Sequence, residues 1–187
     1  MAGTLSVQKI QGLATSAAPT TVEIASGHKI TGASGAIAVP GSVVQVITNQ
    51  STDHSTTATY YASTSTTLSD VPIWIATITP KYANSKIRIN AHGAGLLRGI
   101  GNSTKLRVLR DSTAIVDCSR FQYTEANATW ESWNASFTCF DEPNSTSAIT
   151  YKVQMANHDV TNKQIRIGDY TGNTKSLTSF ELMEIAQ

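Results

Sequence analysis

The chain has few charged residues and no long apolar run. Lys, Arg, Asp and Glu make up 14% of its 187 residues, and the formal net charge is +1. A surface that binds nucleic acid or an anionic membrane needs a clear excess of Lys and Arg. A membrane-spanning helix needs about 20 consecutive apolar residues. We therefore expect no nucleic-acid partner and no insertion into a membrane.

Cysteine is almost missing as well. The two cysteines, Cys118 and Cys139, are too few for a disulfide scaffold and form no Cys-x-x-Cys pair for zinc. We expect two buried thiols, with a single bridge between them as the alternative. The N-terminal stretch MAGTLSVQKIQG also lacks the basic region and the apolar core of a secretion signal.

Good helix formers are scarce, whereas residues suited to strands dominate. Ser and Thr make up about a quarter of the chain, and short runs rich in Val, Ile, Thr and aromatic residues alternate between apolar and polar positions. After residue 43 these runs recur at regular spacing as VVQVIT, ATYYAST, PIWIATIT, KIRINAHG, KLRVLRDSTAIVD, WESWNASFTCF, AITYKVQMAN, KQIRIGD and SFELMEIA. The pattern predicts an all-β fold, namely an antiparallel β-sandwich or jelly roll.

Alternation within these runs also predicts which side chains face the core. In KLRVLRDSTAIVD, Leu106 and Val108 share one face, and the turn Arg-Asp-Ser-Thr joins two strands of a hairpin. In two later runs the inward-facing side chains are expected to be those of Trp133, Ala135, Phe137 and Cys139, and those of Ile149, Tyr151, Val153 and Met155.

The N-terminal part of the chain differs from the rest. Its short strand-like pieces have too few apolar residues to build a core of their own. We expect residues 1–40 to be an extended β anchor or stalk segment, and residues 41–187 to be the sandwich domain. The segment gains a core by pairing with copies of itself or with a shell protein. The expected oligomerisation or anchoring residues are Val7, Ile10, Val22, Ile24 and Ile30.

The glycine-rich stretch HGAGLLRGIG, residues 92–101, resembles a phosphate-binding loop at first sight. A dinucleotide fingerprint needs a third glycine three residues after the second, followed at once by a helix. Arg98 stands at the third position after Gly95, and Gly99 and Gly101 would break the helix. We therefore expect a bulge at Gly93 and Gly95 and a corner where the chain changes sheet.

Motifs that carry chemistry are not found in the sequence. The four histidines, His28, His54, His92 and His158, have no ligand spacing, and no serine lies in a Gly-x-Ser-x-Gly elbow. We expect no metal, no cofactor and no enzymatic activity. A catalytic site assembled from residues distant in the sequence remains the alternative.

Two aromatic residues are candidates for contact with a glycan or a protein partner. Trp130 falls off the alternation that points Trp133 inward, and Tyr123 precedes that run. Exposed aromatic rings near Asn and Glu suit stacking on sugars. Partial burial under a loop or at a subunit contact is the alternative.

Several stretches resemble virion proteins of tailed bacteriophages, especially the short fibre and decoration-like proteins of marine and cyanobacterial phages. The opening TLSVQKIQG, TVEIASGHKITG and VPGSVVQV is similar to their anchor and stalk. The stretches ITPKYANSKIRI, LRVLRDSTAI, ITYKVQMA and FELMEIAQ are similar to their β-sandwich domain. The resemblance implies an all-β fold, a homotrimer, attachment to the particle through the N-terminal segment, and an exposed C-terminal domain.

Three classes of function follow. The first is a non-enzymatic virion structural protein on the particle exterior, assembled in the host cytoplasm: either a trimeric fibre or knob that contacts the host surface, or a capsid decoration, cement or head-fibre protein. The second is a stand-alone carbohydrate-binding β-sandwich. The third is an enzyme that uses the glycine-rich stretch.

Overall fold

The computed structural model describes Ser26, Gly32 and residues 39–51, 61–124, 130–158, 163–170, 174–175 and 177–187. The chain divides into two units, Met1–Ala33 and Ser34–Gln187. The account below concerns the second unit. The five residues expected to oligomerise or anchor the chain, Val7, Ile10, Val22, Ile24 and Ile30, all lie outside the described residues. The expected role of residues 1–40 therefore stays a prediction.

All regular structure in the described part is β-strand, and every strand pairing is antiparallel. No described helix is long and apolar enough to cross a membrane. The strands are β1 (Val43–Ser51), β2 (Tyr61–Ser63), β3 (Ser69–Ile78), β4 (Lys86–Arg98), β5 (Asn102–Arg110), β6 (Thr113–Thr124), β7 (Glu131–Asn134), β8 (Phe137–Asp141), β9 (Ile149–Asn157), β10 (Gln164–Ile167), β11 (Asp169–Tyr170), β12 (Thr174–Lys175) and β13 (Thr178–Ile185).

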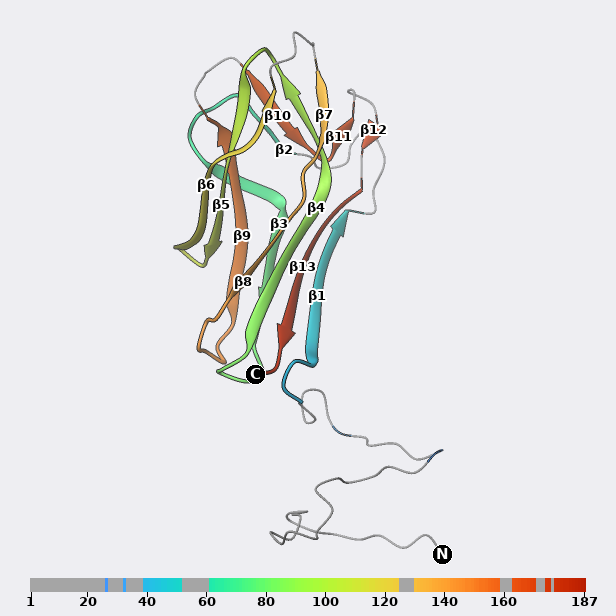
Figure 1. Ribbon diagram of the computed structural model, residues 1–187, viewed down its shortest axis with the longest axis vertical. Helices are drawn as coiled ribbons and strands as arrows, with labels where there is room; N and C mark the ends of the chain where they lie inside the picture. The colour runs from blue at the N-terminus through green and yellow to red at the C-terminus, as the bar shows by residue number, and fades with distance from the viewer. Residues whose placement is uncertain are drawn as a thin grey trace, which may run out of the picture. The chain divides into compact units, whose positions relative to one another are not determined.

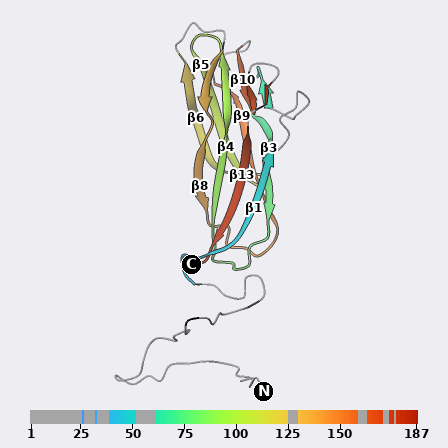
Figure 2. The same ribbon diagram turned by 90° about the vertical axis from the view of Figure 1, so that its right-hand side faces the viewer.

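Two sheets pack face to face as a sandwich (Figures 1 and 2). The eight main strands run β1-β13-β4-β8 in the first sheet and β3-β9-β5-β6 in the second. Numbered one to eight along the chain, these orders are 1-8-3-6 and 2-7-4-5. Chain-neighbouring strands such as β1 and β3 thus lie in different sheets, which is the two-Greek-key arrangement of a jelly roll. The predicted fold class is confirmed.

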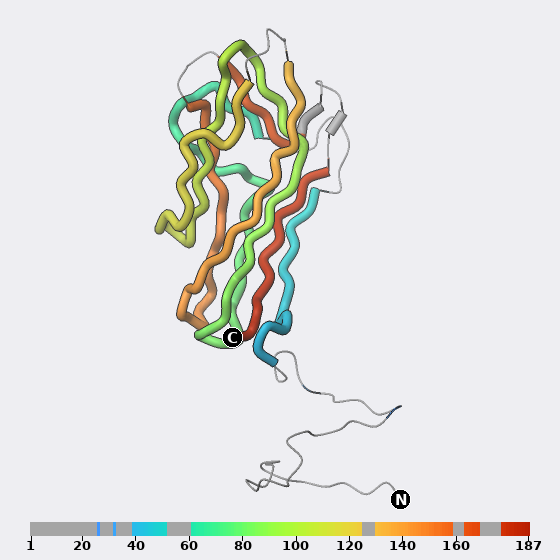
Figure 3. Tube along the Cα trace, in the orientation of Figure 1, coloured from blue at the N-terminus to red at the C-terminus, as the bar shows by residue number. Residues whose placement is uncertain are grey.

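The first sheet is lengthened by three short strands. On one side of β4, β13 pairs with the first half of the strand and β10 pairs with the second half. β2 then pairs with the other edge of β10. On the other side of β4, β7 pairs beyond β8. The tube drawing shows these short strands at the end of the sandwich away from the C-terminus (Figure 3). β4 is therefore the one main strand of this sheet that runs unbroken along both halves.

The glycine-rich stretch differs in part from its prediction. Gly93 and Gly95 do not mark a bulge but lie within the continuous strand β4. They are glycines because neighbouring strands fill the space: a Cβ atom on Gly93 would lie 2.6 Å from Cγ2 of Thr178, and one on Gly95 would overlap the indole of Trp133. The corner comes later, where Gly99 (φ +95°) and Gly101 (φ +63°) turn the chain from β4 in the first sheet to β5 in the second.

The core lies between the sheets and follows the predicted alternation. In β4, Ile87, Ile89 and Ala91 are fully buried, while Arg88 and Asn90 between them are part-exposed. The inward sides of β5 and β9 are buried as predicted, and those of β7 and β8 are buried or half-buried. Phe121 of β6 packs edge-on against Trp133 and Phe137 and so closes the side of the sandwich where β6 and β8 are the outer strands.

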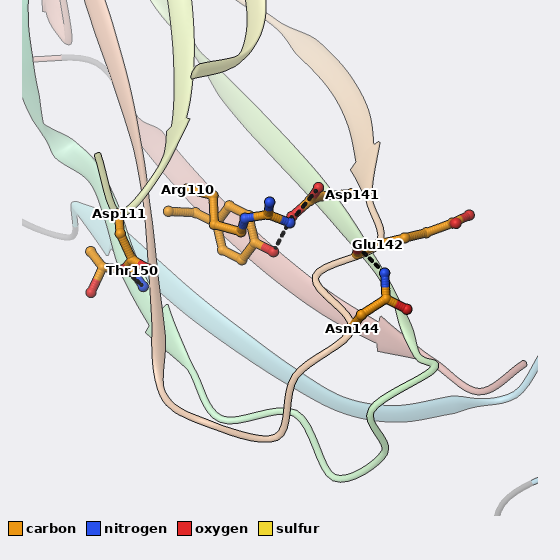
Figure 4. A network of polar contacts seen from close by, with 7 residues as sticks. Arg110, Asp111, Asp141, Glu142, Asn144 and Thr150 are labelled. Atoms are coloured by element: carbon orange, nitrogen blue, oxygen red, sulfur yellow. Dashed lines mark hydrogen bonds and ion pairs between the residues drawn. The ribbon is translucent and has the colours of Figure 1, made fainter. Parts of the chain in front are cut away.

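A charged network joins the sheets near the turn between β5 and β6 (Figure 4). Nη1 of Arg110 in β5 lies 3.2 and 3.0 Å from the two carboxylate oxygens of Asp141, the last residue of β8. The hydroxyl of Tyr151 in β9 donates a hydrogen bond of 2.7 Å to Oδ2 of the same carboxylate. Asp141 belongs to the first sheet and its two partners to the second, so the network ties the layers together.

A second polar cluster fixes the connection between β3 and β4. Glu184 of β13 is fully buried. Its Oε1 accepts hydrogen bonds from the backbone amides of Lys81 and Tyr82, at 2.8 and 3.1 Å, and from the hydroxyl of Ser85 at 2.7 Å. Its Oε2 accepts one from Nε2 of Gln45 at 2.6 Å. The carboxylate thereby substitutes for the strand partners that the connecting loop lacks.

The two cysteines are free thiols, Cys118 in β6 and Cys139 in β8. Both are part-exposed rather than fully buried, so the prediction of unbridged thiols is confirmed and the prediction of full burial is not. Partial burial, and then the charge of Asp141, raise the pKa of Cys139 from 9.0 to about 11.

Candidate binding surface

The outer face of the first sheet carries polar groups that could bind a ligand. Along β4 the odd-numbered residues from Ile87 to Leu97 point toward the core, so His92, Ala94, Leu96 and Arg98 point outward. Strand pairing places Ser132 of β7 on one side of Leu96 and Arg166 of β10 on the other. These residues define the half of the face near β7 and β10 in Figure 1.

Trp130, one residue before β7, contacts two guanidinium groups. Cζ of Arg166 lies 4.4 Å from the centroid of the Trp130 ring, and Cζ of Arg98 lies 5.8 Å from it. β10 and β7 flank β4 on opposite sides, so the Arg166 side chain must cross β4 to reach the ring. The crossing explains why Leu96 is only 1% exposed although it points away from the core.

The predicted glycan or partner contacts, Tyr123 and Trp130, are not brought together as a pair. Trp130 flanks the first sheet, whereas Tyr123 belongs to β6 in the second sheet. Tyr123 is 45% exposed, and Cζ of Arg120 lies 6.0 Å from its ring centroid. Each ring faces a guanidinium group, so a sugar would meet a mixed cationic and aromatic surface at either position.

A depression of about 530 Å³ opens on the outer face around Ala94 of β4 and Ser132 and Asn134 of β7. Its lining residues are His92, Gly93, Ala94, Ser132, Trp133, Asn134 and Leu177. Gly93 and Ala94 carry little or no side chain, which leaves space over this part of β4. The remaining residues carry hydrogen-bonding side chains, apart from one exposed Leu, and this composition is suited to a polyhydroxylated ligand.

His92, Ser136 and Asn134 form a hydrogen-bonded chain at the edge of the depression. Nδ1 of His92 lies 2.7 Å from Oγ of Ser136, and this hydroxyl donates to Oδ1 of Asn134 at 2.7 Å. A hydroxyl has one proton to donate, so Nδ1 of His92 must donate its own proton to Ser136. In this arrangement His92 is a hydrogen-bond donor toward Ser136.

The sequence did not single out Ser132, Asn134 or Ser136. Their signal was present, because a run whose odd positions face the core puts Ser132 and Asn134 on the opposite face. The alternation was used to predict only the buried side chains of this run, such as Trp133 and Phe137. The junction with His92 could not have been found, because it depends on the pairing of β7 and β8 with β4.

Within the described ranges no group of three or more His, Cys, Asp or Glu residues could hold a metal ion. His28 and His54 lie outside those ranges. His158, next to the end of β9, has a pKa lowered first by burial and then by the charges of Arg120 and Lys105.

No protein-family model and no curated protein sequence matches the chain. Among solved structures, it is similar to a mutant VP2 protein of infectious bursal disease virus in derived T=1 particles, with 12% identity and a TM-score of 0.39 over 76% of this chain and 36% of that one. For the VP2 subviral particle of the same virus the values are 11%, 0.34, 76% and 38%. The chain spans little more than a third of those proteins. Because these TM-scores are below 0.5, the likeness carries no argument about function.

Proposed function

We propose that the chain is a non-enzymatic structural protein of a virus particle, displayed on the exterior and in contact with the host surface. The observation that carries the proposal is the jelly-roll topology of the domain whose strands resemble tailed-phage virion proteins. Jelly rolls occur in viral capsid and lectin domains. Fold alone does not fix function, so the sequence resemblance and the low content of charged residues in a Ser- and Thr-rich chain supply the rest of the support.

The outer face of the first sheet also supports association with other copies. Register places Val46, Met183, Arg88 and Phe140 in one row across β1, β13, β4 and β8. Val46 is 45% and Phe140 is 55% exposed. Apolar side chains aligned across an exposed face are typical of a contact surface. We propose that copies of the chain meet through this row in a homotrimer.

Sedimentation equilibrium of the full chain tests the trimer. The expected mass is three times 20.0 kDa, and Phe140→Ser should shift the equilibrium toward monomers. Thr138→Ser, at the next outward-facing position of β8, is the matched control and should leave the mass unchanged. A monomeric wild-type protein would contradict the trimer and favour a stand-alone carbohydrate-binding domain.

Location on the particle is tested by gold-antibody labelling of intact particles with antibody raised to residues 43–187. Label on the tail supports a fibre that contacts the host, which is the arrangement we propose. Label over the head supports a decoration, cement or head-fibre protein attached through the N-terminal segment. Absence of label from every particle would overturn the virion proposal.

The stand-alone carbohydrate-binding domain remains a second candidate because of one observation. The depression around Ala94, Ser132 and Asn134 is lined by hydrogen-bonding groups and opens to solvent. This candidate differs from the first in predicting a monomer and no association with particles.

A further inference from the structure

We infer that the Trp130 end of the outer face binds a saccharide that carries a carboxylate. The inference names the ligand class for the proposed host contact and therefore rests on that function. Its two parts are the depression, whose hydrogen-bonding groups suit the hydroxyl groups of the saccharide, and the guanidinium group of Arg98, which suits the carboxylate.

The positive charge at this end is held in a fixed position. The ring of Trp130 lies against both guanidinium groups, and such cation–π contacts restrict the long arginine side chains. Nε of Arg166 also donates a hydrogen bond of 3.2 Å to Oε1 of Gln164. A guanidinium that is already ordered loses less conformational entropy when it binds an anion.

Arg98 is the residue best placed to meet an anion. Its side chain is exposed at the end of β4, and it forms no ion pair with any residue that the structure describes. Some other outward charges of the sandwich do form ion pairs, such as Lys86 with Glu142 at 3.0 Å and Lys152 with Asp70 at 2.9 Å. A planar guanidinium can donate two parallel hydrogen bonds to the two oxygens of one carboxylate.

The depression and the arginines are close enough for one ligand. Ala94, which lines the depression, and Arg98 lie on the same face of β4, about 13 Å apart along the strand. Ser132 also lines the depression and pairs with Leu96, which lies midway between them. A saccharide of two or more linked rings can therefore place hydroxyl groups near Asn134 and Ser132 and a carboxylate near Arg98.

A neutral sugar could bind by stacking on the ring of Trp130 alone. Both guanidinium groups already contact the ring, so less of it is free to stack on a neutral sugar. The charge beside the ring favours an acidic saccharide over a neutral one. Because this charge is at the surface, salt should weaken the binding.

The test is calorimetric titration of the full chain with tetragalacturonate, with its methyl ester, with 3′-sialyllactose and with sodium acetate. We expect at least one of the two acidic saccharides to bind and acetate to show no saturable binding. If tetragalacturonate binds, its neutral methyl ester should bind roughly tenfold or more weakly. Equal binding of acid and ester, binding of acetate as tight as that of the saccharide, or binding of neither acidic saccharide would overturn the inference.

Variants locate the site. Arg98→Gln should weaken binding by roughly tenfold, and Arg98→Lys should weaken it less because the charge remains without the planar fork. The matched control is Arg107→Gln, which removes the same charge from β5 in the second sheet, and it should bind like the wild type. An equal loss in both glutamine variants would mean a general charge effect and would contradict the assignment.

This test is independent of the particle experiment. Saccharide binding by a protein that no particle carries would overturn the virion role and leave the ligand class standing. Labelled particles whose purified protein binds no acidic saccharide would overturn the ligand class and leave the virion role standing.

Discussion

Gly95 of β4 and Trp133 of β7 lie directly opposite each other on neighbouring strands of the first sheet, and the indole of Trp133 occupies the place where a side chain on Gly95 would lie. Trp133 is 9% exposed and packs edge-on against Phe121 of the second sheet, with ring centroids 5.5 Å apart. The glycine is therefore required by the packing of a large aromatic residue, and no phosphate-binding loop is needed to explain it.

Substitution Gly95→Ala should destabilise the domain, because the added methyl group displaces a packed indole. We expect the free energy of unfolding to fall by about 1–3 kcal/mol, measured by urea denaturation. Trp133→Phe in the same chain should recover part of this loss, because the smaller ring leaves room for the methyl group. Ala94→Ser, at the neighbouring outward position, is the control and should change stability by less than about 0.5 kcal/mol. An additive double mutant would show that the two residues do not compete for space.

The buried carboxylate of Glu184 gives a second prediction. Glu184→Ala removes the acceptor of four hydrogen bonds and leaves the amides of Lys81 and Tyr82 without it. We expect the free energy of unfolding to fall by about 2–4 kcal/mol, together with faster hydrogen exchange at the two amides. Glu184→Gln should lose less, because one side-chain oxygen remains.

The control for Glu184 is Glu181, on the outward face of the same strand. Glu181→Ala should change stability by less than about 0.5 kcal/mol. If the two alanine variants were equally stable, the carboxylate of Glu184 would not be what holds the loop between β3 and β4.

Sequence patterns predicted the parts of the fold that depend on alternation. Ile87, Ile89 and Ala91, and the inward set of β9 that includes Tyr151, are buried where the period of two put them. The hairpin of β5 and β6 turns at Asp111, whose φ is +53°. The carboxylate of Asp111 accepts a hydrogen bond of 2.9 Å from the backbone amide of Thr150. Local chemistry is enough for such features, because Asp tolerates the left-handed region.

Features that depend on partners distant in the sequence were missed. The run of β4 through Gly93 and Gly95 depends on Thr178 and Trp133, which lie 85 and 38 residues further along the chain. The candidate binding surface likewise needs β4, β7 and β10 side by side. Trp130 was recognised as outward-facing, but its two arginines come from strands whose pairing the sequence does not specify.

The thiol of Cys139 gives a third prediction. Burial, and then the charge of Asp141, raise its pKa to about 11, so little thiolate is present near neutral pH. We expect Cys139 to react with a maleimide at pH 7.5 much more slowly in the folded protein than in urea, as followed by mass spectrometry. Both cysteines should be alkylated in urea without prior reduction. A mass that reports only one or no alkylated cysteine under these conditions would contradict the free thiols.

Tyr151 gives a prediction about alkaline pH. Burial first, and then the hydrogen bond to Asp141 and the charge of that carboxylate, raise its pKa well above the ordinary value of 10.0. Above pH 10 the unfolded chain loses this proton while the folded chain keeps it, so the folded state binds more protons and its stability falls as the pH rises. Each such group contributes a slope of about 1.4 kcal/mol per pH unit. Below pH 10 the contribution is fully present.

Urea denaturation between pH 8 and pH 12 measures this slope. Tyr151→Phe should reduce the slope by the share of one proton, and at pH 8 it should cost about 1 kcal/mol for the hydrogen bond to Asp141. Cys139 adds its own loss between pH 9 and pH 11, so the comparison is made with Cys139→Ala in both chains. The pKa of Tyr61 is raised by burial as well, so part of the slope should persist in the variant. An unchanged slope in Tyr151→Phe would mean that the phenol has the same pKa in the folded and unfolded states. The hydrogen bond from Tyr151 to Asp141 would then not be part of the network that joins the two sheets.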